Sequence, residues 1–182
     1  SGGANPKIGI VTAGKSYLDT RQSFVELGLD EVRANELGLR LYKVAMTWPL
    51  EPNGLEKFAK GLDLILVVEE KRALIETQVK EQLFDWPQHP QVLGKNDETG
   101  DWLFPAKGAL ESLNVAIAIG ERILRVTPDE QLATRLQELK ALKDDLPGQT
   151  SAIVRTAYFC AGCPHNSSTV IPDGARAYAG IG

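Results

Sequence analysis

The architecture of this chain can be worked out from residues 62–69, which read Leu-Asp-Leu-Ile-Leu-Val-Val-Glu. A run of this length suits a strand and is far too short to cross a membrane as a helix. The stretch also lacks the alternation of polar residues that marks a strand with one solvated face. It therefore predicts a strand at the centre of a parallel sheet whose two faces are both covered.

Short apolar runs alternate with segments of helical period on both sides of this strand. The order is typical of parallel strands joined by crossover helices, so the predicted fold class is α/β. Asp30 is the expected N-cap of the second helix. Further strands are expected at residues 7–12, 39–46 and 91–95. Helices are expected at residues 16–27, 30–37, 53–60 and 110–125, and around the apolar stripe Ile75, Val79 and Leu83.

The composition is that of a globular protein, with 43% hydrophobic and 24% charged residues. A formal charge of −4 gives no electrostatic reason to expect nucleic acid or an anionic membrane as a partner. No run reaches the length of a transmembrane helix, and no secretory signal opens the sequence. We therefore expect a cytoplasmic protein with reduced cysteines.

A separate helix is expected to begin at Thr127, because Pro128 suits the first helical position and Glu130 completes a capping box. This helix carries an apolar stripe that needs a surface to pack on, formed by Leu132, Leu136, Leu139 and Leu142.

The composition changes near residue 150 to serine, threonine, proline and glycine, which indicates a domain boundary. We expect an α/β domain at residues 1–126 and a connecting helix at residues 127–149. Residues 150–182 are then expected to begin a second domain that is incomplete.

Both cysteines lie in one short segment, Cys160-Ala161-Gly162-Cys163-Pro164-His165-Asn166. Structural zinc and cubane iron–sulfur clusters usually take four protein ligands, whereas the chain holds two cysteines and two histidines. If Cys160 and Cys163 bind a metal, the remaining ligands are expected beyond residue 182, and the chain is a piece of a longer protein. A redox pair, a disulfide and two ordinary thiols remain as alternatives.

Residues 9–16 match the phosphate-loop pattern, which ends here in Gly14, Lys15 and Ser16. A small nucleotide-binding domain is therefore the alternative function. A phosphate loop must curl between its glycines, however, and residues 8–11 have the pattern of a continuous strand. The sequence thus favours a strand here, with the turn beginning at Ala13.

Two other features favour structural roles. Adjacent Glu69 and Glu70 point to different sides, and a solvated helix start with Lys71 and Arg72 is a better interpretation than an acid–base pair. The three tryptophans are expected to be core or interface anchors, since no basic stripe accompanies them.

Four separated blocks of the sequence resemble the indolepyruvate ferredoxin oxidoreductase family, most closely its long, fused-chain bacterial form. They are residues 7–17, 42–52, 67–72 and 158–182, in the same order as in the family. The first three resemble the family's middle domain. That resemblance implies the fold of the transketolase C-terminal domain, a three-layer α/β/α sandwich on a mainly parallel sheet, followed by a helix and an extended, loop-rich tail.

The last block resembles the opening of the family's thiamine-diphosphate-binding domain, which carries a C-x-G-C-P-H sequence. The resemblance implies that Cys160 and Cys163 either help to ligate a cluster or line the cofactor pocket. In the pocket alternative, Gly162 allows close approach of the backbone, and His165 or Asn166 contacts the cofactor or substrate.

The resemblance implies a 2-oxoacid:ferredoxin oxidoreductase that converts aryl 2-oxoacids such as indolepyruvate to acyl-coenzyme A. Thiamine diphosphate with Mg²⁺ and 4Fe-4S clusters would be cofactors of the full-length enzyme, and ferredoxin its electron acceptor. The expected partners are the remaining domains of the same chain, coenzyme A, the 2-oxoacid and further copies in a homo-oligomer, without nucleic acid or membrane.

Within such an enzyme, this domain is expected to be a non-catalytic scaffold and interface. The Leu-rich helix that begins at Thr127 and the exposed loop at residues 48–50 are the expected docking surfaces. The magnesium-diphosphate motif and the ferredoxin-like cysteine clusters are absent from the sequence, so the isolated chain is expected to be inactive and to hold no cofactor.

Overall fold

The computed structural model describes residues 6–145 and 159–176. They belong to two compact units, residues 1–147 and residues 148–182, and each unit is described by itself. The predicted boundary at residue 150 lies outside the described residues, so the domain limits stay predictions.

The first unit is built on four parallel strands in the order β2-β1-β3-β4. They are β1 (Ile8–Ala13), β2 (Leu39–Val44), β3 (Leu64–Val68) and β4 (Gln91–Leu93). β3 pairs with β1 on one side and β4 on the other, and all five of its residues are buried. The α/β class and the central position of this strand are therefore confirmed.

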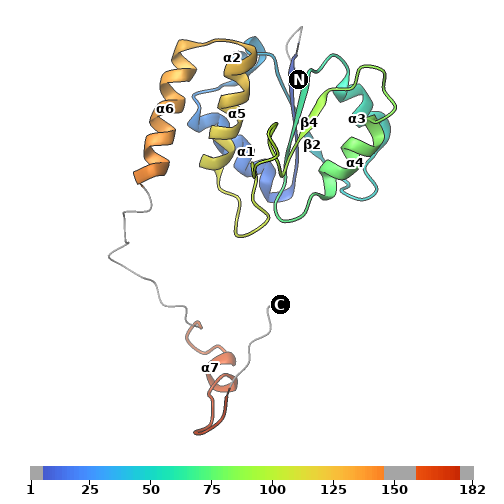
Figure 1. Cartoon of the computed structure of the whole chain (residues 1–182). Coiled ribbons are helices and arrows are strands. Elements are labelled where there is room, and N and C mark those ends of the chain that lie inside the picture. The colour runs from blue at the N-terminus through green and yellow to red at the C-terminus, as the bar shows by residue number, and fades with distance from the viewer. Residues whose placement is uncertain (1–5, 146–158, 177–182) are drawn as a thin grey trace. The chain divides into compact units, whose positions relative to one another are not determined.

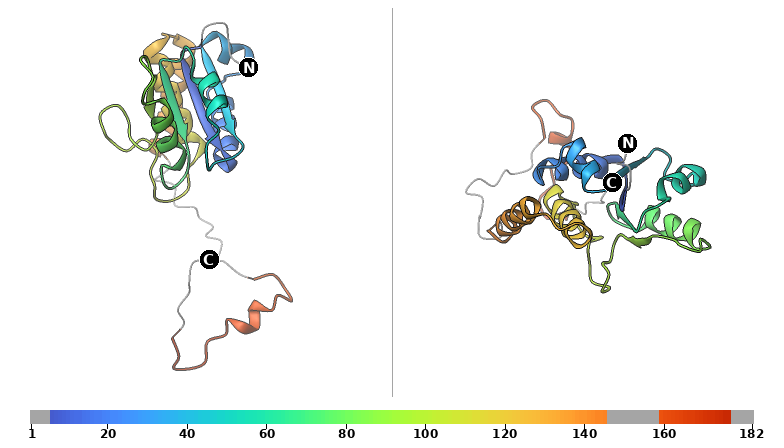
Figure 2. Two further views of the ribbon diagram at one scale, coloured as in Figure 1. Left: turned by 90° about the vertical axis from the view of Figure 1, so that its right-hand side faces the viewer. Right: turned by 90° about the horizontal axis from the view of Figure 1, so that it is seen from above.

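Helices cover both faces of the sheet and make a three-layer sandwich (Figures 1 and 2). One face carries α1 (Gly14–Glu26), α2 (Glu31–Glu36), α5 (Ser112–Val126) and α6 (Glu130–Asp145). The other face carries α3 (Pro52–Ala59) and α4 (Leu74–Leu83). None of the described helices has the length and apolar character needed to cross a membrane.

Alternate residues of β3 point to opposite faces of the sheet and belong to two separate hydrophobic cores. Leu64, Leu66 and Val68 pack with α5 and α6 on one face. Ile65 and Val67 pack with α3 and α4 on the other. Each fully buried aliphatic side chain contributes about 2 kcal/mol through the apolar area removed from water. Because β3 contributes side chains to both cores, it holds the three layers together.

Gly9 lies in the middle of β1, where α3 approaches the sheet closely. A Cβ at this position would lie 2.7 Å from Cζ of Phe58, closer than real Cβ contacts occur, and would also collide with Leu62. The glycine therefore permits close helix–sheet packing.

The helix starts show which capping signals the chain uses. Asp30 caps α2 as predicted, since its carboxylate accepts the N–H of Arg33 at 2.7 Å. The predicted cap at Thr127 is wrong, because its N–H donates to the Ile123 carbonyl and closes α5. Asp129 caps α6 instead and accepts the N–H of Leu132 at 2.8 Å.

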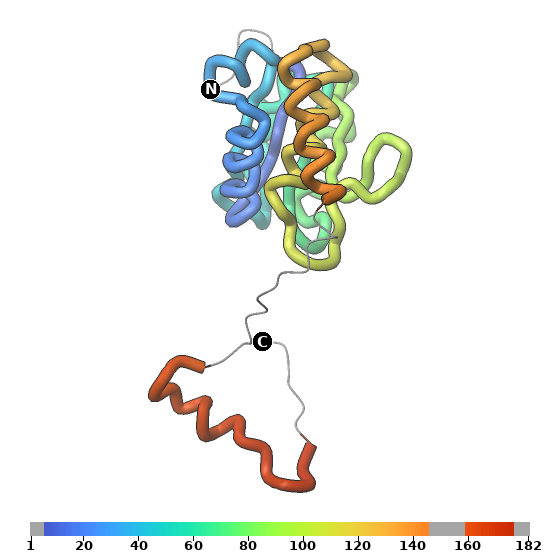
Figure 3. The backbone as a smooth tube through the Cα atoms, turned by 90° about the vertical axis from the view of Figure 1, so that its left-hand side faces the viewer, coloured from blue at the N-terminus to red at the C-terminus, as the bar shows by residue number. Residues whose placement is uncertain are grey.

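α6 lies beside α5 (Figure 3). Three leucines of its predicted apolar stripe belong to the same core as the buried side chains of α5. Leu132, Leu136 and Leu139 are buried, whereas Leu142 is 52% exposed. The first three leucines thus pack within this unit, which corrects the prediction that this face of the helix is a docking surface.

Candidate functional site

The sheet has a topological switch point between β1 and β3, because the chain continues from β1 to a neighbour on one side and later returns on the other. Folds of this kind bind ligands in the crevice at the carboxyl ends of the strands that flank this point. The residues at these ends are Ala13, which is the last residue of β1, Gly14 and Lys15, which follow it, and Glu69 and Glu70, which follow β3.

Three chain segments meet at this edge and close it. The Lys15 ammonium lies 3.0 Å from the Glu70 carboxylate and donates to the Leu110 carbonyl at 2.7 Å. The Leu110 N–H in turn donates to the same Glu70 oxygen at 3.1 Å. We call these three residues the edge clamp. Lys15 also pairs with Asp19 at 2.9 Å, so its positive charge faces two carboxylates.

The edge clamp shifts the protonation equilibria of its charged members. The hydrogen bond from Lys15, followed by that from the Leu110 N–H, lowers the pKa of the Glu70 carboxyl below its ordinary value. Hydrogen bonds to Asp19 and Glu70 raise the pKa of the Lys15 ammonium.

The predicted phosphate-loop alternative is not supported by this geometry. Ile10, Val11 and Thr12 pair with β2 and β3, so a strand occupies the place where the loop would curl. α1 begins directly at Gly14, and Lys15 is engaged in the edge clamp.

We expect the substitution Glu70→Gln to make the free energy of unfolding depend less on pH in the acidic range. The pKa of this carboxyl is lowered in the folded chain, so its stabilising effect is complete above the ordinary value of 4.5 and is lost as the pH falls below it. Urea unfolding of wild type and variant across the acidic range measures the difference. The control is Glu56→Gln, at an exposed position of α3. If the unfolding free energy of Glu70→Gln fell as steeply with decreasing pH as that of the wild type, this role of the edge clamp would be contradicted.

Glu69 is buried at the end of β3, which corrects the prediction of a solvated helix start. Its carboxylate accepts the N–H groups of Leu74, Ile75 and Glu76 at 3.1, 2.9 and 3.0 Å. These groups open α4, and a negative charge there is stabilised by the helix dipole. Glu69 is therefore the anchor between β3 and α4.

A buried lysine lies beside this anchor. Lys95 is 6% exposed, and its ammonium donates to the Glu69 carbonyl at 2.5 Å. Burial lowers the pKa of the Lys95 ammonium, and the carboxylates of Glu69, Glu76 and Glu70 offset part of that shift. The Glu76 carboxylate accepts the Lys95 N–H at 2.9 Å. These contacts tie the end of β4 to α4.

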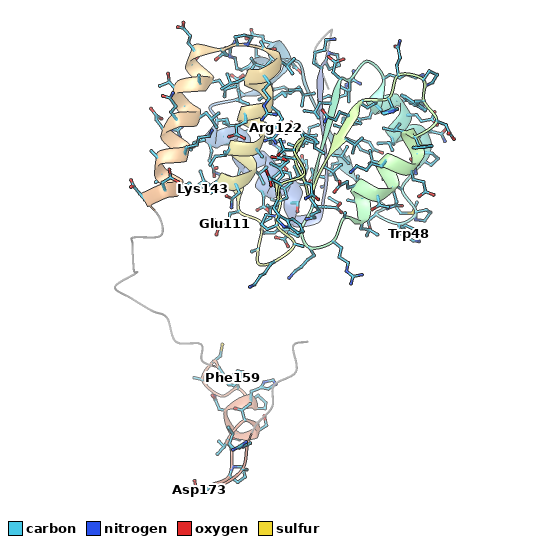
Figure 4. The ribbon with its side chains drawn as sticks, in the orientation of Figure 1. Trp48, Glu111, Arg122, Lys143, Phe159 and Asp173 are labelled. Atoms are coloured by element: carbon cyan, nitrogen blue, oxygen red, sulfur yellow. The ribbon has the colours of Figure 1, made fainter. Side chains whose placement is uncertain are left out.

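Two hollows of the first unit have linings that include none of the residues at the switch point. One is a groove of about 540 Å³ beside β2, lined by α1 and α2 residues that include Tyr17 and Phe24. The other, of about 250 Å³, lies by α5 and α6 and includes Arg122 and Lys143 (Figure 4). Arg122 is neutralised there by Glu98 at 2.8 Å and Glu121 at 3.1 Å.

In the second unit, the predicted cysteine segment forms a tight turn. The Cys163 N–H donates to the Cys160 carbonyl at 3.0 Å, and Gly162 has a φ of 80°. A positive φ at the third of four residues is typical of a type II turn and favours glycine. A Cβ on Gly162 would meet no atom within 4 Å. The glycine is therefore required here for its backbone angle.

Asn166 and His165 hold this turn from the short helix α7 (His165–Ser168). The Asn166 side-chain amide donates to the Cys160 carbonyl at 3.0 Å, and its N–H donates to the Cys163 carbonyl at 3.0 Å. Nδ1 of His165 lies 3.2 Å from Sγ of Cys163, and the imidazole stacks on Phe159 with ring centroids 5.2 Å apart. All five predicted site residues thus lie together.

The predictions from sequence missed the edge clamp, the anchor role of Glu69 and the stack of Phe159 on His165. A basic residue after one parallel strand and acids after the next could have indicated the Lys15–Glu70 pair, since the carboxyl ends meet at one edge. Within residues 6–145 and 159–176, no group of three or more His, Cys, Asp and Glu side chains is arranged to hold a metal ion.

Comparison with known proteins gives a family match and three curated relatives. The family model of the indolepyruvate oxidoreductase domain matches residues 1–145. Indolepyruvate oxidoreductase subunit IorA of Pyrococcus abyssi (strain GE5 / Orsay) is 26% identical over 167 residues, which are 92% of this chain and 23% of that protein. The same subunit of Pyrococcus horikoshii gives the same identity and coverage, and that of Thermococcus kodakarensis is 25% identical over 169 residues. The chain thus spans about a quarter of the length of these relatives.

Among solved structures, a chain described as a split gene transketolase, inactive beta4 tetramer, is similar with a TM-score of 0.43 and 18% sequence identity. The similarity covers 66% of this chain and 39% of that chain.

Proposed function

We propose a function from one premise: this chain belongs to the indolepyruvate oxidoreductase domain family. The complete enzyme would oxidatively decarboxylate aryl 2-oxoacids, chiefly indolepyruvate, to acyl-coenzyme A and pass the electrons to ferredoxin. Residues 6–145 would be a non-catalytic structural and interface domain of that enzyme.

The edge clamp is the observation that carries the scaffold role. The switch point is where a sheet of this topology would bind a substrate or cofactor. Here Lys15, Glu70 and the backbone of Leu110 form hydrogen bonds with one another at that place. A catalytic lysine needs a free hydrogen-bonding position toward its substrate, whereas Lys15 has three contacts within the fold, to Asp19, Glu70 and the Leu110 carbonyl.

The loop after β2 supports an interface role. Trp48 is 67% exposed and lies on the α3–α4 side of the unit (Figure 4). Its loop is held firmly by α4: the Gln78 side chain bonds the Thr47 carbonyl at 2.9 Å and the Leu50 N–H at 2.8 Å, and Gln82 donates to the Leu50 carbonyl at 2.8 Å. An exposed tryptophan on a fixed loop suits docking against another domain or subunit.

The cysteine turn would lie at the cofactor site of the complete enzyme. Its two thiols are half of the four that a cubane cluster usually takes. Cys160 and Cys163 would therefore supply two cluster ligands, or would shape the thiamine-diphosphate pocket together with Gly162, His165 and Asn166. Thiamine diphosphate would supply the carbanion chemistry of decarboxylation when bound with Mg²⁺.

The test is an assay of the complete enzyme that carries this chain, with indolepyruvate, coenzyme A and a viologen acceptor. Wild type is compared with Cys160→Ala, Cys163→Ala, Glu70→Gln and Trp48→Ala, and the iron content and oligomeric state are recorded for each. Loss of turnover with loss of iron in the cysteine variants assigns the pair to a cluster, and loss of turnover with iron retained assigns it to the cofactor pocket.

The remaining variants test the scaffold role. Glu70→Gln is expected to keep turnover within a few-fold of wild type, because a residue whose role is structural adds no interaction that is made only in the transition state. Trp48→Ala is expected to weaken subunit or domain association. A folded Glu70→Gln enzyme without turnover would overturn the scaffold role, and a wild type without indolepyruvate-dependent reduction would overturn the substrate assignment.

A further inference from the structure

The cysteine turn brings the only two thiols of this chain to positions one and four of a β-turn. Residues at these positions have Cα atoms closer than about 7 Å, which is the range in which a disulfide can form. Two features then fix the turn: the positive φ of Gly162 and the paired hydrogen bonds of Asn166. The two sulfur-bearing residues are therefore held near each other before any reaction.

The two thiols differ in their exposure to solvent and in their contacts with neighbouring side chains. Cys160 is exposed, whereas Cys163 is half-buried with its sulfur 3.2 Å from the His165 imidazole. The imidazole is itself held by its stack on Phe159. An incoming oxidant thus reaches Cys160 more readily, and Cys163 is kept in place at the other end of the turn.

We propose that Cys160 and Cys163 are a reversible dithiol–disulfide site that reacts with small-molecule disulfides. The Cys160 sulfur attacks one sulfur of the oxidant, so that a mixed disulfide forms and one thiol leaves. The Cys163 sulfur then attacks the Cys160 sulfur, the intramolecular S–S bond forms and the second thiol leaves. Two electrons and the two thiol protons pass from the protein to the oxidant, which ends as two thiols.

This site does not depend on the proposed enzyme function, because the reaction needs neither substrate nor iron. It can be measured on the 182-residue chain itself, which has no other cysteine. The chain is equilibrated with glutathione and glutathione disulfide in the presence of a metal chelator, quenched by alkylation and analysed by intact mass.

We expect the folded chain to form the intramolecular disulfide at least about fivefold more readily than the same chain in denaturant, because the turn raises the effective concentration of the two thiols. Gly162→Ala and Asn166→Ala should each lose most of this advantage, since they disturb the turn without removing a sulfur. Cys163→Ser should accumulate the mixed disulfide on Cys160 faster than Cys160→Ser accumulates it on Cys163.

Equal oxidation of the folded and denatured chains would overturn the proposal. So would Gly162→Ala and Asn166→Ala variants that oxidise as readily as wild type, or a Cys163 that reacts with glutathione disulfide faster than Cys160. An inactive complete enzyme whose chain still shows the expected oxidation would overturn the proposed function alone.

Discussion

The variant Glu69→Ala should lose about 3 kcal/mol of unfolding free energy, because three N–H groups at the start of α4 lose their acceptor together with a helix cap. Two of these three hydrogen bonds are buried, so water cannot replace the carboxylate there at low cost. Glu69→Gln should lose less, since its side-chain carbonyl can still accept part of the set. Urea unfolding at neutral pH, followed by circular dichroism, measures all three proteins.

The matched control for this prediction is Glu81→Ala, on the same helix but exposed. A change at such a surface position should stay within about 0.5 kcal/mol. If Glu69→Ala lost no more stability than Glu81→Ala, the anchor between β3 and α4 would not exist as described.

The second large effect is expected at Leu136 on α6. Leu136→Ala should lose about 3 kcal/mol, because the truncation leaves a cavity where α6 meets α5. Leu136 is 5% exposed, and its Cδ1 would lie 3.1 Å from a Cβ at Gly120. The leucine therefore packs directly against the glycine surface of α5. The same urea unfolding experiment measures this loss.

Leu142→Ala provides the comparison, since Leu142 lies one to two turns further along α6 and is 52% exposed. It should change the unfolding free energy by less than about 0.5 kcal/mol. A difference between the two variants shows that α6 is part of the folded unit. Two equally small losses would mean that this helix only connects one part of the chain to another.

The elements that the sequence predicted best are those whose pattern is local. The aliphatic run of β3 and the nearly all-apolar surface of α5 identify buried elements from a few adjacent residues. The start of α6 was harder, since Thr127 and Asp129 are both good caps and lie two residues apart. The choice depends on where α5 ends, because Thr127 gives its N–H to that helix.

The candidate site was predictable only in part. The cysteine segment is contiguous, and its turn follows from a glycine at the right spacing. In the edge clamp, Lys15 is separated from Glu70 by 55 positions in the sequence and from Leu110 by 95. These partners can therefore be identified only when the strand order is known. Glu69 was misjudged because a glutamate usually lies in water, whereas here three backbone N–H groups replace that water.

The long separation within the edge clamp has a consequence for synthesis on the ribosome. Leu110 is made 95 residues after Lys15, which at 5–20 residues per second is roughly 5–20 s later. During that interval β1, β2 and β3 can all have emerged, yet their carboxyl ends still lack the backbone groups that close them. The nascent chain would therefore carry an open, charged crevice, and a chaperone that binds it would have to leave before Leu110 can dock on Lys15 and Glu70.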